Sequence, residues 1–193
     1  MRTVIWSNAF AKSFKRWTRK RPQIEQQGYG LVTLHRPSNV DEPVVLKKLC
    51  EALVQISKKI PLVFPIHPRT RKNLEQHQLY SFLKNCKGLF LPDPMSYMRF
   101  MNMVFNCRLV ITDSGGIQEE TTYLGIPCLT LRPNTERPIT HGTNRLCECS
   151  DLEKRANEIL SGSTVQKEKI EFWDGKTAGR IVDFLRKFPC FLS

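Results

Sequence analysis

The sequence lacks the long apolar runs that would cross a membrane, and it lacks the short apolar core of a secretory signal. It also has no paired CxxC units. Its seven cysteines are odd in number and scattered, which argues against a disulfide framework. Cys147 and Cys149 form the only close pair, and no further cysteine or histidine has a spacing that matches a zinc site. We therefore expect no metal, no cofactor and a reducing, cytoplasmic compartment.

Acidic side chains are scarce in the first 27 residues, where Glu25 stands against seven Lys or Arg. Half of the net charge of +12 therefore sits in this segment. A transit peptide or an arm that binds nucleic acid would share this composition, but a poorly ordered N-terminal segment, here called the basic lead, is the simpler interpretation. We divide the chain into a basic lead over 1–27 and one domain over 28–193. We expect no nucleic-acid partner, because the aromatic residues are not interleaved with the charge, and no membrane partner.

The rest of the sequence alternates short apolar runs with amphipathic segments, without repeats or low-complexity tracts. A length of 193 residues and a hydrophobic content of 40% suit one domain with its own core. The pattern predicts a parallel α/β sheet with right-handed crossovers. Strands are expected over 29–34, 61–66, 88–91, 108–112 and 127–131. Helices are expected over 43–59, 69–83 with a break near its middle, 97–106, 115–124, 152–160 and 177–188.

The most informative stretch is an apolar run that stops at Asp113-Ser-Gly-Gly116, where a helical pattern begins. Ser114, Gly115 and Gly116 would let the backbone turn closely around a diphosphate, with helix-start amides and the helix dipole attracting the anion. Glu120 lies about 9 Å further along that helix, at roughly 1.5 Å per residue, and its carboxylate suits the hydroxyls of a ribose. An ordinary strand-turn-helix is the alternative, because short glycine motifs recur by chance.

Three other polar clusters each follow an apolar run: Thr33-Leu-His-Arg-Pro37, Phe64-Pro-Ile-His-Pro-Arg69 and Leu131-Arg-Pro-Asn-Thr-Glu-Arg-Pro138. The carboxyl ends of parallel strands share one edge of a sheet, and ligands bind at that edge. We therefore expect the four clusters to converge on one crevice.

With these residues in view, the sequence resembles the C-terminal half of a non-hydrolysing UDP-N-acetylglucosamine 2-epimerase, over roughly Tyr29 to Leu185. The resemblance implies a Rossmann-like parallel sheet flanked by helices, as in the C-terminal half of a two-domain GT-B-type fold. The motifs that carry it are Leu31-Val-Thr-Leu-His-Arg-Pro-Ser-Asn-Val40, Val63-Phe-Pro-Ile-His-Pro-Arg-Thr-Arg71, Asp113-Ser-Gly-Gly-Ile-Gln-Glu-Glu120, Asn134-Thr-Glu-Arg-Pro138, Gly142-Thr-Asn144 and Trp173-Asp-Gly-Lys176.

The family resemblance also assigns roles to single residues. It implies that His35 is catalytic and acts near the leaving diphosphate, although a histidine after a strand is more often structural. His67 is interpreted as a residue of the pocket wall or of a regulatory site. Arg137 would contact the diphosphate, for which a guanidinium fork is well shaped. Met95 and Phe100 match the uracil pocket, although Met and Phe at helical spacing are usually core.

The implied reaction is the interconversion of UDP-N-acetylglucosamine and UDP-N-acetylmannosamine, by elimination and re-addition of UDP. This would make the protein an isomerase of nucleotide-sugar and polysaccharide biosynthesis. In the family, carboxylates of the N-terminal domain remove the C2 proton, and they have no counterpart in these 193 residues. We therefore expect a truncated form that binds UDP weakly and does not epimerise alone. Both a homodimer and pairing with a chain that supplies the first domain stay open.

Two alternatives are a catalytically silent UDP-sugar binding module and a GT-B-type glycosyltransferase domain. Fold alone does not separate these classes. The paired His-Arg-Pro and Thr-Glu-Arg-Pro motifs favour the epimerase family, since transferases of that architecture lack them as a set.

Overall fold

The structure is a computed structural model that describes residues 21–135, 142–162 and 170–187. Its strands form one parallel sheet in the order β3-β2-β1-β4-β5-β6. Their bounds are β1 Gly30–Thr33, β2 Leu62–Val63, β3 Leu89–Phe90, β4 Leu109–Thr112, β5 Cys128–Thr130 and β6 Asn144–Leu146. β1 and β4 lie side by side at the centre, with Gly30 opposite Leu109 and Thr33 opposite Thr112. The prediction of a parallel α/β sheet is confirmed.

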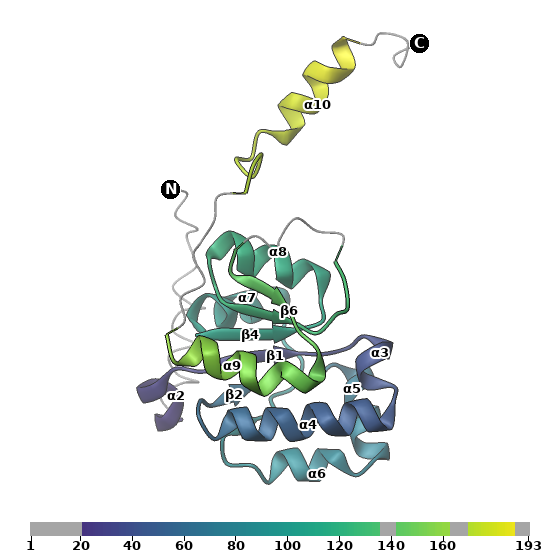
Figure 1. Cartoon of the computed structure of the whole chain (residues 1–193), viewed down its shortest axis with the longest axis vertical. Helices are drawn as coiled ribbons and strands as arrows, with labels where there is room; N and C mark the ends of the chain where they lie inside the picture. The colour runs from purple at the N-terminus through teal and green to yellow at the C-terminus, as the bar shows by residue number, and fades with distance from the viewer. Residues whose placement is uncertain (1–20, 136–141, 163–169, 188–193) are drawn as a thin grey trace.

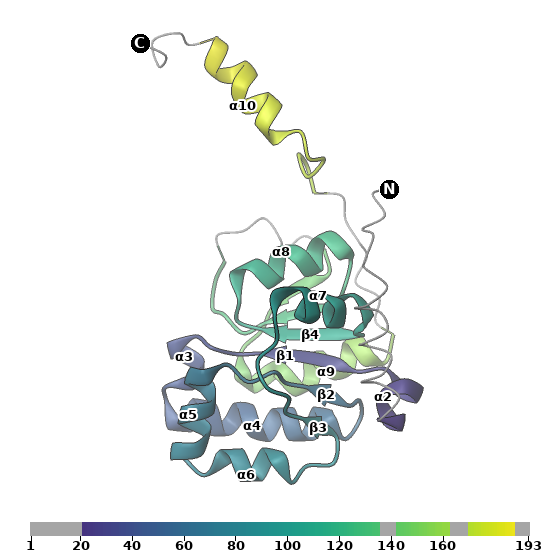
Figure 2. The same cartoon turned by 180° about the vertical axis from the view of Figure 1, so that it is seen from behind.

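Helices cover both faces of this sheet (Figures 1 and 2). One hydrophobic cluster joins the sheet to four helices: α4 (Pro43–Ser57), α5 (Pro68–Gln76), α6 (Leu79–Lys84) and α9 (Leu152–Leu160). A second cluster holds α2 (Pro22–Gln27), α7 (Tyr97–Asn106) and α8 (Gly115–Leu124) against the sheet. Short helices α3 (Pro37–Val40) and η1 (Cys149–Asp151, a 3₁₀ helix) lie in connections.

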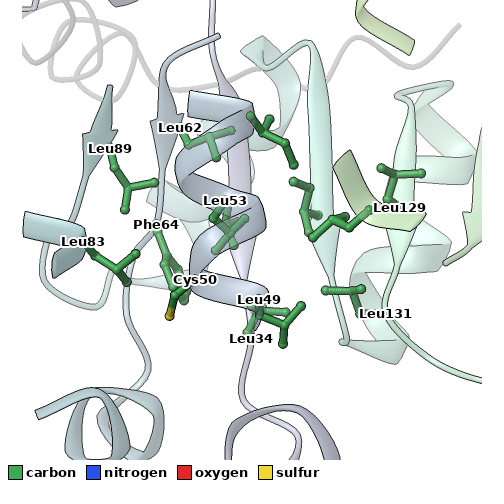
Figure 3. Packing of buried hydrophobic residues seen from close by; sticks show 14 of the residues in the cluster. Leu34, Leu49, Cys50, Leu53, Leu62, Phe64, Leu83, Leu89, Leu129 and Leu131 are labelled. Atoms are coloured by element: carbon green, nitrogen blue, oxygen red, sulfur yellow. The ribbon is translucent and has the colours of Figure 1, made fainter. Parts of the chain in front are cut away.

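The two clusters follow from the alternation of side chains along each strand. In β1, Leu31 belongs to the α7 side and Val32 to the α4 side; in β4, Val110 and Ile111 divide in the same way. Figure 3 shows the α4 side, where Leu49 and other apolar side chains of α4 pack over the strands. These strands are buried on both faces, which explains why they are almost continuously apolar in sequence.

Several elements match their predicted bounds from end to end, namely α7, α8 and α9. The predicted break in 69–83 is also confirmed: α5 ends at Gln76, and Gln78 adopts a left-handed conformation with φ 58° before α6 begins. Four elements were not predicted from the sequence, namely α2, α3, η1 and β6. These are short elements with too few residues for a clear period, so their formation depends on their neighbours in space.

Helix α10 (Thr177–Arg186) has no buried residue, and Figures 1 and 2 show it set apart from the sheet and its helices. Ile181 and Phe184 of this helix are among the exposed large hydrophobic side chains. Within the described ranges, no helix is both long enough and apolar enough to cross a membrane.

Candidate functional site

The sheet order places a topological switch point between β1 and β4. β2 and β3 continue on one side of this pair, and β5 and β6 on the other. In such sheets, the loops that leave the carboxyl ends of the two central strands diverge and form a ligand crevice. Here these loops begin at Leu34 and Asp113, so two of the four predicted polar clusters meet at the switch point.

Asp113 is the centre of this meeting point, and it is fully buried. Its Oδ2 accepts hydrogen bonds from the backbone N–H groups of His35 (3.0 Å) and Arg36 (2.9 Å) and from Asn39 Nδ2 (3.1 Å). Its Oδ1 accepts from the same His35 N–H at 3.2 Å and lies 3.1 Å from His35 Nδ1. Asn39 Nδ2 also donates to the carbonyl of Leu131 at 3.0 Å, which joins the loop after β5. The Asp113 carboxylate thus connects the loop after β4 to the loop after β1 directly, and to the loop after β5 through Asn39.

The loop after β2 is held against the loop after β1 by α5. Thr70 Oγ1 donates to the carbonyl of Leu34 at 2.5 Å, and Asn73 Nδ2 donates to the carbonyl of Val40 at 2.8 Å. Arg69 forms a two-point ion pair with Asp41 in the same region. The hydrogen bond from Arg69, with a smaller contribution from Asn73, lowers the pKa of the Asp41 carboxyl below its ordinary value.

These contacts bring the two histidines together, with their ring centroids 5.6 Å apart and the rings tilted by 40°. The His35 side chain is 39% exposed, whereas His67 is exposed at the N-terminus of α5. His67 Nδ1 accepts a hydrogen bond from the backbone N–H of Arg69 at 3.3 Å, so His67 caps the helix. The convergence of the clusters after β1, β2 and β4 is confirmed by these contacts.

The Ser-Gly-Gly turn opens α8 as predicted, with Ser114 as its extended N-cap residue. The backbone N–H of Ser114 donates to Thr112 Oγ1 at 3.0 Å, and Gln118 Nε2 donates to the Ser114 carbonyl at 3.2 Å. Gly116 is exposed, and a Cβ built on it meets no atom within 4 Å. The turn is therefore open to solvent, and the amides of a helix's first turn have no acceptor within the helix.

Glu120 lies in the same helix and uses only part of its hydrogen-bonding capacity. Its Oε1 accepts a hydrogen bond from the Tyr97 hydroxyl at 2.6 Å, and this bond raises the pKa of Tyr97. Its Oε2 is buried and has no hydrogen-bond partner among the residues that the structure describes. A hydroxyl group therefore already reaches this carboxylate, and a second acceptor oxygen is unused. This is the chemistry that a ribose diol would complement.

The remaining predicted residues are less informative. Met95 and Phe100 are half-buried and pack against the cluster on the α7 side, which is the ordinary core role for such side chains. Arg137 lies outside the described residues. Roles in binding or catalysis for these three residues, and for the others proposed from sequence, stay predictions.

Asp113 and Asn39 lie within the sequence motifs but received no predicted role, and Tyr97 was not predicted to belong to the site. A signal for Asp113 was available, because an acidic residue that directly follows an apolar strand at a Gly-Gly turn is poorly placed for simple solvation. Asn39 and Tyr97 carried no such signal, since their partners lie 74 and 23 residues away in the sequence.

In the part of the chain that the structure describes, no three His, Cys, Asp or Glu side chains gather in a group that could hold a metal ion. Burial raises the pKa of the Cys147 thiol to about 12, and it raises that of the Cys149 thiol as well. Both thiols therefore stay protonated at neutral pH, a state that does not favour metal binding.

Comparison with known proteins gives a consistent picture. A family model described as UDP-N-acetylglucosamine 2-epimerase matches residues 4–186. The matched range includes the expected range of roughly Tyr29 to Leu185 and begins before it, and the division of the chain at residue 27 stays a prediction. The UDP-N-acetylglucosamine 2-epimerase of Methanocaldococcus jannaschii is 40% identical over 163 residues, which are 81% of this chain and 44% of that protein. The UDP-2,3-diacetamido-2,3-dideoxy-D-glucuronate 2-epimerase of Pseudomonas aeruginosa is 35% identical, over 84% of this chain and 45% of its own length.

Solved structures show the same likeness. The Methanocaldococcus jannaschii enzyme in complex with UDP-GlcNAc and UDP has a TM-score of 0.72 at 34% identity, over 93% of this chain and 52% of that one. The Neisseria meningitidis UDP-GlcNAc 2-epimerase bound to UDP-GlcNAc has a TM-score of 0.72 at 27% identity, over 91% of this chain and 49% of that one. The chain thus spans about half the length of the relatives that it matches.

Proposed function

The chain belongs to the UDP-N-acetylglucosamine 2-epimerase family, and we propose that its residues form the part of such an enzyme that holds the nucleotide diphosphate. The observation that carries this proposal is the pairing of His35 with buried Asp113 at the β1–β4 switch point, next to the open N-terminus of α8. A diphosphate placed there would meet backbone amides on one side and an imidazole on the other.

In this proposal the phosphate groups lie at Ser114, Gly115 and Gly116. The absence of a side chain at exposed Gly116 lets a ligand approach the backbone, and the dipole of α8 favours negative charge at this end. Arg137 would add a guanidinium to the same diphosphate. The Arg137 contribution rests on the family motif alone.

The ribose lies at Glu120, two helical turns beyond the turn that holds the phosphates. One ribose hydroxyl would donate to the unused Oε2, and the other would share or replace the Tyr97 hydroxyl at Oε1. Met95 and Phe100 would border the uracil ring. They form the apolar edge of the cluster on the α7 side, which is a suitable neighbour for a flat base.

The reaction we propose for the whole enzyme is inversion at C2 of the sugar. A base removes the C2 proton while the C1–oxygen bond breaks, and its electron pair leaves with the diphosphate of UDP. UDP then adds again to the resulting glycal, with the proton returning to C2 from the opposite face. His35 would assist the departure by offsetting the charge that develops on the diphosphate.

The sugar is the less constrained part of this proposal. Relatives carry the names of 2-epimerases for UDP-N-acetylglucosamine and for a diacetamido glucuronate. Both are UDP-linked sugars with an acetamido group at C2, so the nucleotide site described above serves either one. We propose UDP-N-acetylglucosamine as the substrate, because the matching family model carries that description.

Isothermal titration calorimetry with UDP tests the nucleotide site. We expect saturable UDP binding by the 193-residue polypeptide, weaker binding of a nucleoside diphosphate with a purine base, and no saturable binding of a DNA oligomer. Glu120→Gln should weaken UDP binding by about tenfold, since it removes the charge from a hydrogen-bonded acceptor. Glu51→Gln, at an exposed position of α4 on the opposite face of the sheet, is the control and should leave the affinity unchanged. Equal loss in both variants would contradict the ribose assignment.

Proton NMR in deuterium oxide tests the reaction. Epimerisation through loss of the C2 proton places deuterium at C2 of the product. The polypeptide of these 193 residues should show neither product nor exchange by itself, because the family resemblance assigns the base to the other half of the relatives. Conversion by this polypeptide alone would show that its own residues supply the base. A cytoplasmic location, a homodimer and pairing with a further domain stay predictions.

A further inference from the structure

We propose that Asp113 is the positioning residue of the site: it holds His35 with the proton on Nδ1, so that Nε2 faces the ligand. This inference rests on the proposed function, in which His35 acts on the departing diphosphate. It adds a second residue to that step, one that touches no substrate and acts through the orientation and the tautomer of the imidazole.

The contact between the two side chains fixes the proton. Asp113 Oδ1 lies 3.1 Å from His35 Nδ1. A carboxylate can only accept, so an unprotonated Nδ1 would place its lone pair against the oxygen. The arrangement is favourable only when Nδ1 carries the hydrogen. In the neutral imidazole, Nε2 is then the nitrogen with the free lone pair.

Asp113 has no freedom to turn away from His35. Its side chain is fully buried, and three hydrogen bonds from His35 N, Arg36 N and Asn39 Nδ2 converge on Oδ2. These donors also compensate for the cost of burying a carboxylate. Because two of the donors belong to the loop that carries His35, the same carboxylate fixes both the backbone and the ring of this residue.

The consequence lies at the other end of the ring. Nε2 points away from Asp113, on a side chain that keeps 39% of its surface exposed. When the imidazole is protonated, Nε2–H can donate its proton to the diphosphate oxygen as the C1–oxygen bond breaks. The ring then returns to the neutral form with its hydrogen on Nδ1, beside the Asp113 carboxylate.

His67 provides an internal reference with the opposite preference. Its Nδ1 accepts a hydrogen bond from the backbone N–H of Arg69, so in the neutral ring the hydrogen must sit on Nε2. Two histidines whose rings lie 5.6 Å apart are thus expected to be in different tautomers.

Nitrogen-15 NMR of the histidine rings tests this expectation directly. In the neutral form, long-range proton–nitrogen correlations distinguish the protonated nitrogen of each ring, and His35→Gln and His67→Gln assign the signals. We expect His35 with the hydrogen on Nδ1 and His67 with the hydrogen on Nε2. A His35 ring with the hydrogen on Nε2, or an equal mixture of both tautomers, would overturn the proposal. The wild-type spectrum decides this without any variant of Asp113 and without UDP, so its result is independent of the proposed function.

A double-mutant cycle tests whether Asp113 acts through His35. Asp113→Asn places an amide where the carboxylate was, and its NH₂ group favours an unprotonated Nδ1. We expect a shift of the His35 ring toward the other tautomer and a loss of UDP affinity of about tenfold, similar to that of His35→Gln. The double variant should bind UDP no more weakly than either single variant. Additive losses would overturn the positioning role, and Asp151→Asn, at an exposed position, serves as the control that leaves tautomer and affinity unchanged.

Discussion

The two histidines that follow β1 and β2 have similar surroundings in the sequence and different surroundings in the structure. Each stands beside an arginine and a proline just after an apolar run. Nδ1 of His35 contacts the fully buried carboxylate of Asp113, whereas His67 is exposed and caps the helix that begins beside it. One ring therefore has its orientation set by the core, and the other by a local contact at the surface.

This difference shows that the strand which a histidine follows determines its contacts more than the surrounding motif does. β1 lies next to β4, so the loop after β1 meets the acidic residue that ends β4. β2 lies one strand further from the switch point, and the helix that follows its loop, α5, contacts the loop after β1 through the hydrogen bond from Thr70 to the Leu34 carbonyl. A buried charge-assisted network is costly to disturb, while an exposed cap or ion pair is not.

The largest effect is expected from Asp113→Ala. The variant removes the carboxylate that accepts from two partly buried backbone N–H groups, and it removes one of the two acceptors of the Asn39 side-chain amide. We expect the free energy of unfolding to fall by about 3 kcal/mol, measured by urea denaturation. Asp41→Ala is the matched control, since its partner Arg69 is exposed and its loss should be much smaller. Equal losses in the two variants would show that the loops after β1 and β2 do not differ as described.

A smaller difference is expected between the two histidines in ligand binding. His35→Gln should weaken UDP binding by about tenfold, because a ring held toward the diphosphate is lost. His67→Gln should change the affinity by less than about twofold, since this ring is anchored to its own helix and not to the switch point. Calorimetry on both variants provides the comparison. A larger loss for His67→Gln would reverse the assignment of the two rings.

The smallest effect is expected from the ion pair that links the two loops. Hydrogen bonding to Arg69 places the pKa of Asp41 in the folded chain below its ordinary value of 3.8. The stabilisation from this pair is therefore present at neutral pH, and it is lost as the pH falls from the ordinary value through the lowered one. The stability difference between the wild type and Asp41→Asn, followed by urea unfolding at several pH values, should shrink only in that acidic window. A difference that changes between neutral and mildly acidic pH would point to another group.

The sequence was sufficient for the elements with a clear period. The bounds of α7, α8 and α9 follow from the spacing of their apolar residues. α8 also has a Gly-Gly start, and Gly125, in the left-handed conformation, caps its end. The convergence of polar clusters could also be predicted, because parallel strands bring their carboxyl ends to one edge whatever their order.

What the sequence determined by itself was the longer helices, five of the six strands, the family and the edge of the sheet where polar residues gather, since periodicity and short motifs are local properties. Only the tertiary structure decided that β1 and β4 are neighbours and that Asp113, 78 residues from His35, contacts Nδ1 of its ring. It also decided that Tyr97 donates to Glu120 across two helices. The physical reason is that a buried carboxylate must collect donors from whatever chain packs around it, and that neighbourhood exists only after the sheet has formed.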